Sequence, residues 1–304
     1  MVKRRCPSRL VFVFVFALGV SPLSHDEAWA QEPSSIDHIR AITSPFFNES
    51  ADISTEIRPF YIFNVIPEDF YSDGGYVNLL GVQARYAITD RLAAIFTKAG
   101  YSNVDFDDST LAPDTDGAVN VAFGLKYAIL ARPELSRFLT VGARYEAPAG
   151  DLKSGNVRLE GGGSGMLDMF VSWSSKLGDR WGMQSSAGFD VALDQDKNSS
   201  FFHYGMHLER RFGDRFYAVL ESNVLTTISN GEQLDSSIPG IGSFEGFDLF
   251  NFGSTDSGTV ATIAFGGRYR VNDFIAVGAA YELPMTSRKD VIDHRLTFDT
   301  IFAF

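Results

Sequence analysis

Four side chains able to bind a metal ion or to move a proton fall at alternating positions of one short segment. They are His203, His207, Glu209 and Arg211. In an extended strand, positions four residues apart are separated by about 13 Å, so the two histidines cannot hold one metal ion together. A metal centre would need further ligands from neighbouring strands. The sequence therefore predicts no metal site and no cofactor.

Charged side chains also occur at every second position of many other apolar segments. If these segments are strands that cross a membrane, an arginine or lysine facing lipid would cost about 2–4 kcal/mol at the midplane, so the charges must face inward. The predicted inward-facing side chains are Arg58, Arg85, Lys98, Lys126, Arg144, Glu146, Asp168, Asp190, Glu209, Arg211, Glu221, Arg268, Arg270 and Glu282. They would either line a path for a polar solute or pair across strands and fill the interior. Charge identity alone does not separate these alternatives.

Residues suited to catalysis do not assemble into a recognisable motif. A lipid hydrolase in a barrel wall would need a serine beside a histidine, but no His-x-Ser occurs and His294 has no serine in such an arrangement. Gly150 and Gly155 have the spacing of a P-loop, but Asn156 stands where the phosphate-binding lysine is required. The sequence predicts a protein that is not an enzyme, with a lipid hydrolase as the weaker alternative.

The composition excludes several classes of protein. The chain has 304 residues, of which 45% are hydrophobic and 21% are charged, so it can bury a large core. Its net charge of −12 argues against a nucleic-acid-binding protein, which needs a basic face to displace counterions. The single cysteine, Cys6, excludes a disulfide scaffold and a cysteine-based zinc site.

The first thirty residues have the pattern of a secretory signal peptide. Basic residues precede an apolar run from Leu10 to Val20, and Ala28-Trp29-Ala30 gives a small-x-small cleavage site. The apolar run has about half the length that a membrane-spanning helix needs. We expect cleavage after Ala30 and an exported mature chain without cysteine.

Two-residue alternation dominates the rest of the chain. From Val119 to Tyr127, every odd position is large and apolar and every even position is small or polar, which is typical of a strand between two different environments. Twelve such segments are predicted at 54–66, 75–88, 91–100, 118–130, 137–147, 165–177, 181–193, 201–212, 216–227, 259–271, 274–283 and 290–304. Most have 10–14 residues, whereas strands of soluble proteins average about 5–6 and strands that cross a bilayer need about 9–11.

Short turns alternate with long loops between these segments. The turns at 178–180 and 213–215, for example, are followed along the chain by the loops 194–200 and 228–258. This order is typical of an outer-membrane barrel whose short turns face the periplasm. The sequence predicts an all-β fold over residues 54–304: a single closed antiparallel transmembrane β-barrel of about twelve strands, with ten or fourteen as alternatives. A soluble β-sandwich, which also alternates, is the alternative fold.

The last strand resembles the C-terminal recognition strand of bacterial outer-membrane proteins. Leu296, Phe298, Phe302 and Phe304 share one face, and the chain ends on an aromatic residue. The resemblance implies insertion by the barrel assembly machinery and a location in the cell outer membrane.

Several longer stretches resemble a family of mostly uncharacterised outer-membrane barrels of Gram-negative-type bacteria. They are 89–93, 97–101, 124–127, 145–150, 247–254 and 280–284. A Tyr-Glu-x-Pro sequence beginning at Tyr145 and again at Tyr281 is also similar to barrels assigned to the meta pathway of phenol degradation. The resemblance implies a porin-like barrel with a transport role and no catalytic residues.

The predicted outer loops are acidic, most clearly in 101–117. Such loops would attract cations, contact lipopolysaccharide through divalent ions, or form a solvated surface. In the loop 228–258, Phe244, Phe247 and Phe250 are too apolar to stay in water, so we expect it to pack as a constriction in the barrel mouth or as a cap on the rim. If it constricts, deletion of 236–252 will raise the conductance.

Together these patterns predict an outer-membrane channel or facilitator for the passive passage of small solutes. The predicted partners are outer-membrane lipid, lipopolysaccharide, the assembly machinery and small solutes, with no nucleic acid. Two alternatives stay open: a structural or surface-interaction barrel with a closed lumen, and a barrel-wall enzyme acting on envelope lipids. Residues 31–53 are predicted to be a periplasmic segment that either plugs the barrel or stays loose.

Overall fold

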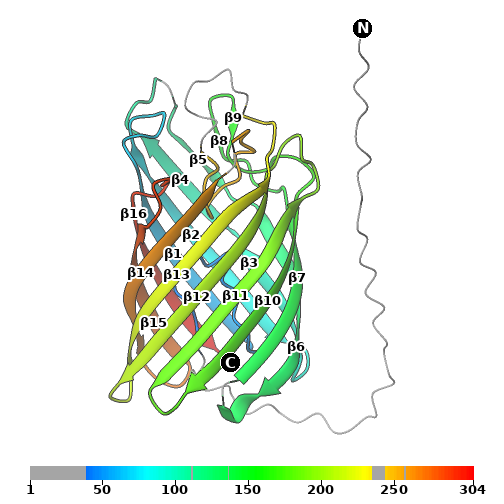
Figure 1. Ribbon diagram of the computed structural model, residues 1–304, viewed down its shortest axis with the longest axis vertical. Coiled ribbons are helices and arrows are strands. Elements are labelled where there is room, and N and C mark those ends of the chain that lie inside the picture. The colour runs from blue at the N-terminus through cyan, green and yellow to red at the C-terminus, as the bar shows by residue number, and fades with distance from the viewer. Residues whose placement is uncertain (1–38, 111, 136, 235–243, 257) are drawn as a thin grey trace. The chain divides into compact units, whose positions relative to one another are not determined.

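The computed structural model describes residues 39–110, 112–135, 137–234, 244–256 and 258–304 (Figure 1). The predicted signal peptide, its cleavage site after Ala30 and residues 31–38 lie outside the described residues, as does the part 235–243 of the long loop. The described residues all belong to one compact unit. No helix among them is long and apolar enough to cross a membrane.

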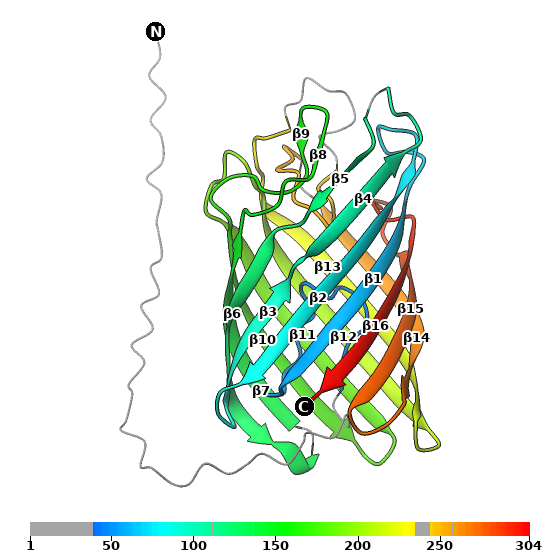
Figure 2. The same cartoon turned by 180° about the vertical axis from the view of Figure 1, so that it is seen from behind.

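One sheet of long strands forms the wall of a barrel (Figure 1, Figure 2). Its strands are β1 (Glu56–Ile66), β2 (Gly75–Ala87), β3 (Leu92–Lys98), β4 (Gly100–Phe106), β5 (Thr115–Ala118), β6 (Val121–Arg132), β7 (Arg137–Ala147), β10 (Met166–Leu177), β11 (Trp181–Ala192), β12 (Ser200–Phe212), β13 (Phe216–Ser229), β14 (Thr259–Arg270), β15 (Ile275–Pro284) and β16 (His294–Ala303). β3 and β4 continue each other in one wall strand, as do β5 and β6, so the wall has twelve strands. β1 pairs antiparallel with both β2 and β16, which closes the sheet. The predicted closed antiparallel barrel is confirmed.

The third and fourth wall strands are longer than the sequence pattern predicts. β4 extends to Phe106 and β5 begins at Thr115, so most of the predicted loop 101–117 is strand and that prediction is wrong. The reason is a register shift next to Lys98. One extra residue moves the following side chains to the opposite face, which interrupts the two-residue alternation in the sequence.

The two ends of the barrel differ in their connections. The long connections gather at one end, which we call the loop end; the short turns and the C-terminus lie at the other, the turn end (Figure 1). A small hairpin of β8 (Lys153–Ser154) and β9 (Val157–Arg158) lies within the connection after β7. A single 3-10 turn, η1 (Pro133–Leu135), precedes β7 at the turn end.

The two faces of the wall differ as alternating strands require. Large apolar side chains such as Leu80 and Phe265 are more than half exposed on the outer face, which gives the apolar belt that meets lipid in membrane barrels. Of the predicted assembly signal, Phe298, Phe302 and Phe304 are exposed on this face and Leu296 is half-buried. Polar and charged side chains alternate with this belt and point inward.

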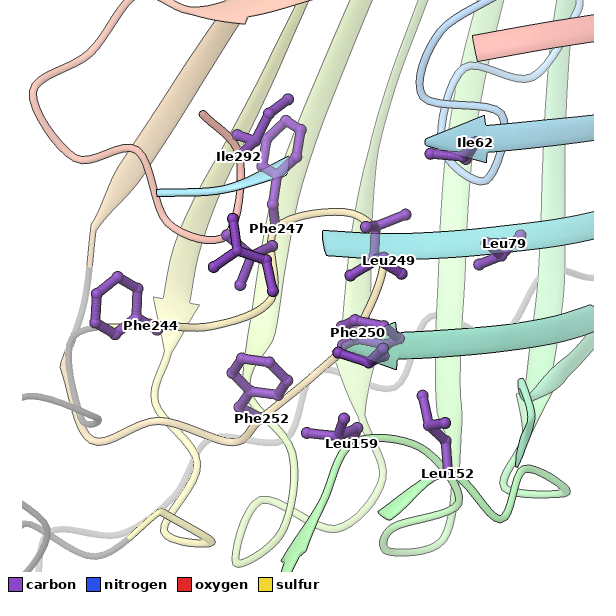
Figure 3. Packing of buried hydrophobic residues seen from close by; sticks show 14 of the residues in the cluster. Ile62, Leu79, Leu152, Leu159, Phe244, Phe247, Leu249, Phe250, Phe252 and Ile292 are labelled. Carbon is purple, nitrogen blue, oxygen red and sulfur yellow. The ribbon is translucent and has the colours of Figure 1, made fainter. Parts of the chain in front are cut away.

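Two segments of the chain fill the interior of the barrel. Residues 39–53, which we call the plug, lie in the half of the lumen nearer the turn end and make polar contacts with the wall. Residues 244–254, which we call the stopper, bring apolar side chains into the half nearer the loop end, where they pack against Ile62 of β1 and Leu79 of β2 (Figure 3). The largest hydrophobic cluster of the described residues therefore lies inside the barrel.

Candidate functional site

The plug is a hairpin-like loop that enters the lumen and returns to β1. Its turn lies at Ser44, whose carbonyl oxygen accepts hydrogen bonds from the backbone N–H of Phe47 (3.1 Å) and of Asn48 (2.9 Å). Every residue from 39 to 53 is buried except Phe47, which is half-buried. The sequence left open whether this segment is loose or tucked inside, and the structure places its described part inside the barrel.

Ion pairs hold the plug to one side of the wall. The carboxylate of Glu49 lies 2.6 Å from a guanidinium nitrogen of Arg85 on β2 and 2.8 Å from the ammonium of Lys126 on β6. Arg40 pairs with Asp52 within the plug and, at 2.8 Å, with Glu56 at the start of β1. Because these groups are almost fully buried, each charge depends on its partner to offset the cost of leaving water.

Hydrogen bonds hold the plug to the opposite side of the wall. Glu221 on β13 accepts the backbone N–H of Ile42 and that of Thr43, both at 2.7 Å, and also the hydroxyl of Thr43. His207 on β12 lies with Nδ1 2.7 Å from the same carboxylate. Further contacts come from other strands: Gln83 donates to the carbonyl oxygen of Pro45 (2.7 Å), Arg58 to that of Ala41 (2.8 Å), and Gln184 to Asn48 (3.2 Å). The plug is thus bonded around the whole circumference.

The stopper closes the other half of the lumen with aromatic side chains (Figure 3). Its five apolar residues are at most 8% exposed: Phe244, Phe247, Leu249, Phe250 and Phe252. The ring of Phe244 meets that of Phe70, in the connection after β1, edge-on at 4.5 Å. The expectation that this loop is too apolar to stay in water agrees with this packing, and the described part of the loop lies within the mouth.

Three polar contacts anchor the stopper. The carboxylate of Asp290 accepts the backbone N–H of Glu245 (3.1 Å) and of Gly246 (2.9 Å). The carboxylate of Glu245 in turn accepts the hydroxyl of Ser199 at 2.5 Å. On the barrel side, Arg295 of β16 lies 2.8 Å from Asp248. The stopper is therefore a folded part of the structure and not a loose loop.

Burial shifts the titration of the loop-end carboxyl groups. Burial raises the pKa of Glu245 to about 8, and the neighbouring Asp290 carboxylate adds to this shift although the Ser199 hydroxyl opposes it. The pKa of Asp290 is raised as well, mainly by burial. In the connection after β7, burial raises the pKa of Glu160 to about 7 despite the ammonium of Lys98 nearby.

The predicted inward-facing charges lie on the inner face of the wall. Eleven are buried: Arg58, Arg85, Lys98, Lys126, Arg144, Asp168, Asp190, Glu209, Glu221, Arg268 and Glu282. Glu146, Arg211 and Arg270 are half-buried. They are thus distributed over most strands of the wall and do not form one compact site.

Most of these charges pair with one another or with the filling segments. Arg58 and Arg268 share Asp299 at 2.7 and 2.8 Å. Arg144 pairs with Asp168 at 2.7 Å. In the same way, Lys98 bridges Glu146 and Glu160 at 2.9 and 2.8 Å. Pairing across strands was one of the two alternatives left open by the sequence.

Space remains inside the barrel at several places, one of them a cavity of about 10 Å³ between Phe47 of the plug and Lys98 of the wall. A cavity of about 590 Å³ opens at the turn end and is lined by Glu209 and Arg211 among others. A cavity of about 10 Å³, roughly the size that holds one water molecule, lies between Asn48 of the plug and Phe247 of the stopper. The two fillings therefore meet near the middle of the barrel, where they lie in series.

Several residues that hold the plug in the lumen were not predicted from the sequence. Arg40, Glu49 and Asp52 belong to a segment without periodicity, and neither their burial nor their partners follow from it. The one available signal was the presence of charges of both signs among apolar residues immediately before a transmembrane strand.

The histidines give no support to enzymatic chemistry. In the described chain, His203 bonds to Asp168, His207 to Glu221 and Glu209, and His294 to Asp293, with no serine hydroxyl among their partners. No group of three or more His, Cys, Asp or Glu side chains within the described ranges is arranged to hold a metal ion.

Comparisons with known proteins establish the fold class and no closer relationship. The chain matches no protein-family model and no curated protein. Among solved structures it is similar to the COG4313 outer membrane channel from Pseudomonas putida F1, with 12% identity and a TM-score of 0.58 over 85% of this chain and 98% of that chain. It also resembles the translocator domain of the autotransporter NalP from Neisseria meningitidis, with 12% identity and a TM-score of 0.49 over 88% and 93% of the two chains. The chain has the fold of an outer-membrane β-barrel.

Proposed function

We propose that this chain is an outer-membrane channel or facilitator for the passive passage of small solutes, closed in the observed conformation by its own plug and stopper. The observation that carries the proposal is the series arrangement of two covalently tethered fillings inside a closed barrel. Both are continuous with the wall only at the ends of strands, so each can leave the lumen without opening the sheet. The similarity to a protein described as an outer membrane channel supports the same function.

The lining of the lumen indicates which solutes fit. In the loop-end half the wall presents an apolar patch of Ile62, Leu79, Val104 and Leu225 to the interior. A wholly polar solute would find few hydrogen-bond partners at this patch, whereas an apolar one would replace the contacts that the stopper now makes. Small solutes with a mainly apolar body are therefore the favoured class.

A structural barrel with a permanently closed lumen is the second candidate. The buried ion pairs of Glu49 with Arg85 and Lys126 favour it, since breaking a buried pair is costly. This candidate and the channel differ in one measurable property, which is whether removal of the fillings leaves a folded barrel that conducts.

Conductance in planar bilayers tests the proposal. Four proteins are compared: the full chain, a deletion of 39–53, a deletion of 236–252, and the double deletion. Because the fillings lie in series, we expect each single deletion to raise conductance modestly and the double deletion to give discrete steps at least about tenfold larger than those of the full chain, as for a barrel with an open lumen. A folded, inserted double deletion that does not conduct would instead support the closed barrel.

Solute preference is measured separately in intact cells. Cells that carry the plug deletion, in which the stopper is the remaining barrier, take up a neutral aromatic solute faster than cells with the full chain, while uptake of a sugar of similar size changes less. Equal acceleration of both solutes would contradict an apolar path and indicate a general pore.

The proposed location is the outer membrane of a bacterium, reached after cleavage behind Ala30. The exposed aromatic residues at 298, 302 and 304 support recognition by the barrel assembly machinery. Replacing Phe304 by serine should lower the amount of inserted barrel in cells while leaving the stability of the refolded protein unchanged. Contact between the acidic outer loops and lipopolysaccharide is proposed to depend on divalent ions and to weaken when a chelator is added.

A further inference from the structure

Arg295 is a fully buried cation at the base of the stopper. Its guanidinium is 0% exposed, and Nε donates a hydrogen bond to Asn64 on β1 at 3.1 Å. Nη1 lies 2.8 Å from an oxygen of Asp248 and 3.5 Å from an oxygen of Glu282 on β15. Of these three polar side chains, only Asp248 belongs to a segment that is not part of the wall.

The stopper offers Arg295 two different groups from consecutive residues. The carboxylate of Asp248 pairs with the guanidinium, and the ring of Phe247 lies over it with 5.4 Å between the guanidinium carbon and the ring centroid. A cation held between an aromatic face and a carboxylate is a recognition arrangement for a molecule that carries both groups. In this conformation Phe247 and Asp248 of the stopper take the place of such a molecule.

The fit of the resident carboxylate is incomplete. Although the ion pair with Asp248 is short, neither Nη1 nor Nη2 of Arg295 has a partner in hydrogen-bond geometry among the described residues, and the same holds for both carboxylate oxygens of Asp248. A guanidinium and a free carboxylate normally form two parallel hydrogen bonds. Because Asp248 is fixed to the backbone, Nη1 and Nη2 of Arg295 keep N–H donors that the carboxylate of a separate molecule could use.

Exchange of one carboxylate for another would keep the charges balanced. Glu282 is held on the wall through one oxygen, which accepts hydrogen bonds from Thr262 (2.5 Å) and Asn223 (2.9 Å), while its other oxygen lies 3.5 Å from Nη1 of Arg295 without a hydrogen bond. If the stopper withdraws, Asp248 moves toward water while Arg295 stays buried and loses the nearer of its two anions. An incoming acid supplies this anion, so no buried charge is left unpaired.

We propose that Arg295 anchors a binding site for small aromatic carboxylates, which the Phe247–Asp248 pair of the stopper occupies in the observed conformation. This inference rests on the proposed function and names a solute class for it: an apolar ring that carries one acidic group. The surrounding apolar wall accommodates the ring, and Arg295 selects the acid.

The geometry also determines which linker between the aromatic ring and the carboxylate of a ligand fits the site. The resident ring covers the face of the guanidinium while the resident carboxylate pairs with one of its nitrogens. Benzoate cannot reproduce both contacts on one guanidinium, because its carboxylate is attached directly to the ring and is nearly coplanar with it. In 3-phenylpropionate, two methylene groups allow the ring to fold back. We therefore expect 3-phenylpropionate to bind more tightly than benzoate.

Equilibrium binding to the folded full chain in detergent tests the site. The probes are 3-phenylpropionate, the neutral 3-phenylpropan-1-ol, and propionate, which lacks the ring. Asp248→Ala removes the resident anion, and Asp256→Ala removes one negative charge from an exposed residue of the same connection as a matched control. We expect Asp248→Ala to tighten binding of 3-phenylpropionate at least about tenfold, since the incoming carboxylate no longer competes with the resident one for the guanidinium. Asp256→Ala should leave the affinity unchanged.

Replacement of the anchor by lysine completes the test. In the Asp248→Ala background, Arg295→Lys keeps the charge, and with it the folded state, but loses the planar fork, so binding of the acid should weaken about tenfold while that of the alcohol is unchanged. Equal affinities for the acid and the alcohol in Asp248→Ala, or no effect of Arg295→Lys on the acid, would overturn the assignment. A barrel that conducts and takes up the neutral solute without preferring the acid refutes only this site. A folded double deletion that does not conduct refutes the channel itself.

Discussion

The two halves of the lumen are closed by different physical means. Near the turn end, the plug is fixed by buried ion pairs and charge-assisted hydrogen bonds, each of which requires one partner at one distance. Near the loop end, the stopper is fixed mainly by apolar packing, which any apolar group of similar volume can replace, with a few polar anchors at its edges. The contacts of the plug are specific to its own charged groups, whereas those of the stopper can be made by other apolar groups.

For the proposed channel, this difference implies a way to select a solute. A mainly apolar molecule can compete for the space of the stopper if one acidic group on it replaces Asp248 at Arg295. It cannot compete for the space of the plug, since Lys126 would be left as a buried cation without its carboxylate and Arg85 would keep only its ion pair with Glu56. In the proposed channel, the loop end would therefore respond to the solute itself, whereas the turn end would need a group that replaces the plug charge for charge.

The largest effect is expected from neutralising the plug. Glu49→Gln leaves Arg85 and Lys126 without their shared carboxylate in a buried site, so the free energy of unfolding should fall by about 3–5 kcal/mol. Urea denaturation followed by the gel mobility of folded and unfolded barrels measures this change. Lys289→Ala, which breaks an exposed ion pair with Asp293, serves as the control and should shift stability by no more than about 1 kcal/mol. A similar result for both variants would show that burial does not distinguish the plug.

A pH-dependent effect of intermediate size is expected at the stopper. The pKa of Glu245 is about 8 in the folded loop, above the ordinary value of 4.5, so the protonated form stabilises packing. This stabilisation is fully present below about pH 4.5 and is lost as the pH rises through 8, where the charge would be buried and would face Asp290, against which the Ser199 hydroxyl, the backbone N–H of Ser254 and Arg288 act only in part. Proteolysis within the stopper should accelerate above pH 8 by up to about tenfold per pH unit.

The glutamine variant controls for other titrating groups. Glu245→Gln cannot ionise, so its proteolysis rate, normalised to that of a free peptide at each pH, should lose the rise near pH 8. An unchanged profile would assign the pH dependence to Asp290 or to the protease.

The smallest effect is expected from one polar anchor. The hydroxyl of Ser199 donates to Glu245 and accepts the backbone N–H of Gly231 at 2.8 Å. Ser199→Ala removes both bonds but leaves the apolar packing of the stopper, so its opening should be favoured by only about 1 kcal/mol. Hydrogen exchange of the stopper amides reports this change. A loss as large as that of Glu49→Gln would mean that polar contacts control both halves.

The wall of the barrel could be predicted because its pattern is local. Residues such as Leu80 and Phe265 alternate with polar neighbours whatever the pairing of the strands, and the alternation also placed Arg58 and Arg268 on the inner face. The prediction from alternation failed near Lys98, where one extra residue moves the following side chains to the opposite face of the wall. The prediction of a twelve-stranded closed barrel needed only local periodicity and the order of turns and loops.

The filling of the lumen could not be predicted because its contacts are distant in sequence. Thr43 meets Glu221, 178 residues away, only after twelve strands have closed. The plug has no periodicity of its own, since its residues contact different strands of the wall. The stopper was easier to foresee, because a run of phenylalanines cannot stay in water, but its burial inside the mouth and its contact with Arg295 depend on the closed wall.

The position of the plug has a consequence for the order of folding. The plug precedes β1, and β1 forms the closing seam with β16, the last strand of the chain. Its side chains reach β2, β6, β11 and β13, which lie on different sides of the wall. Binding of the plug to the wall and pairing of β1 with β16 are therefore coupled during folding. The plug acts as an internal template for the pairing of the strands. A chain without it should still have the correct pairings available, but should reach them more slowly.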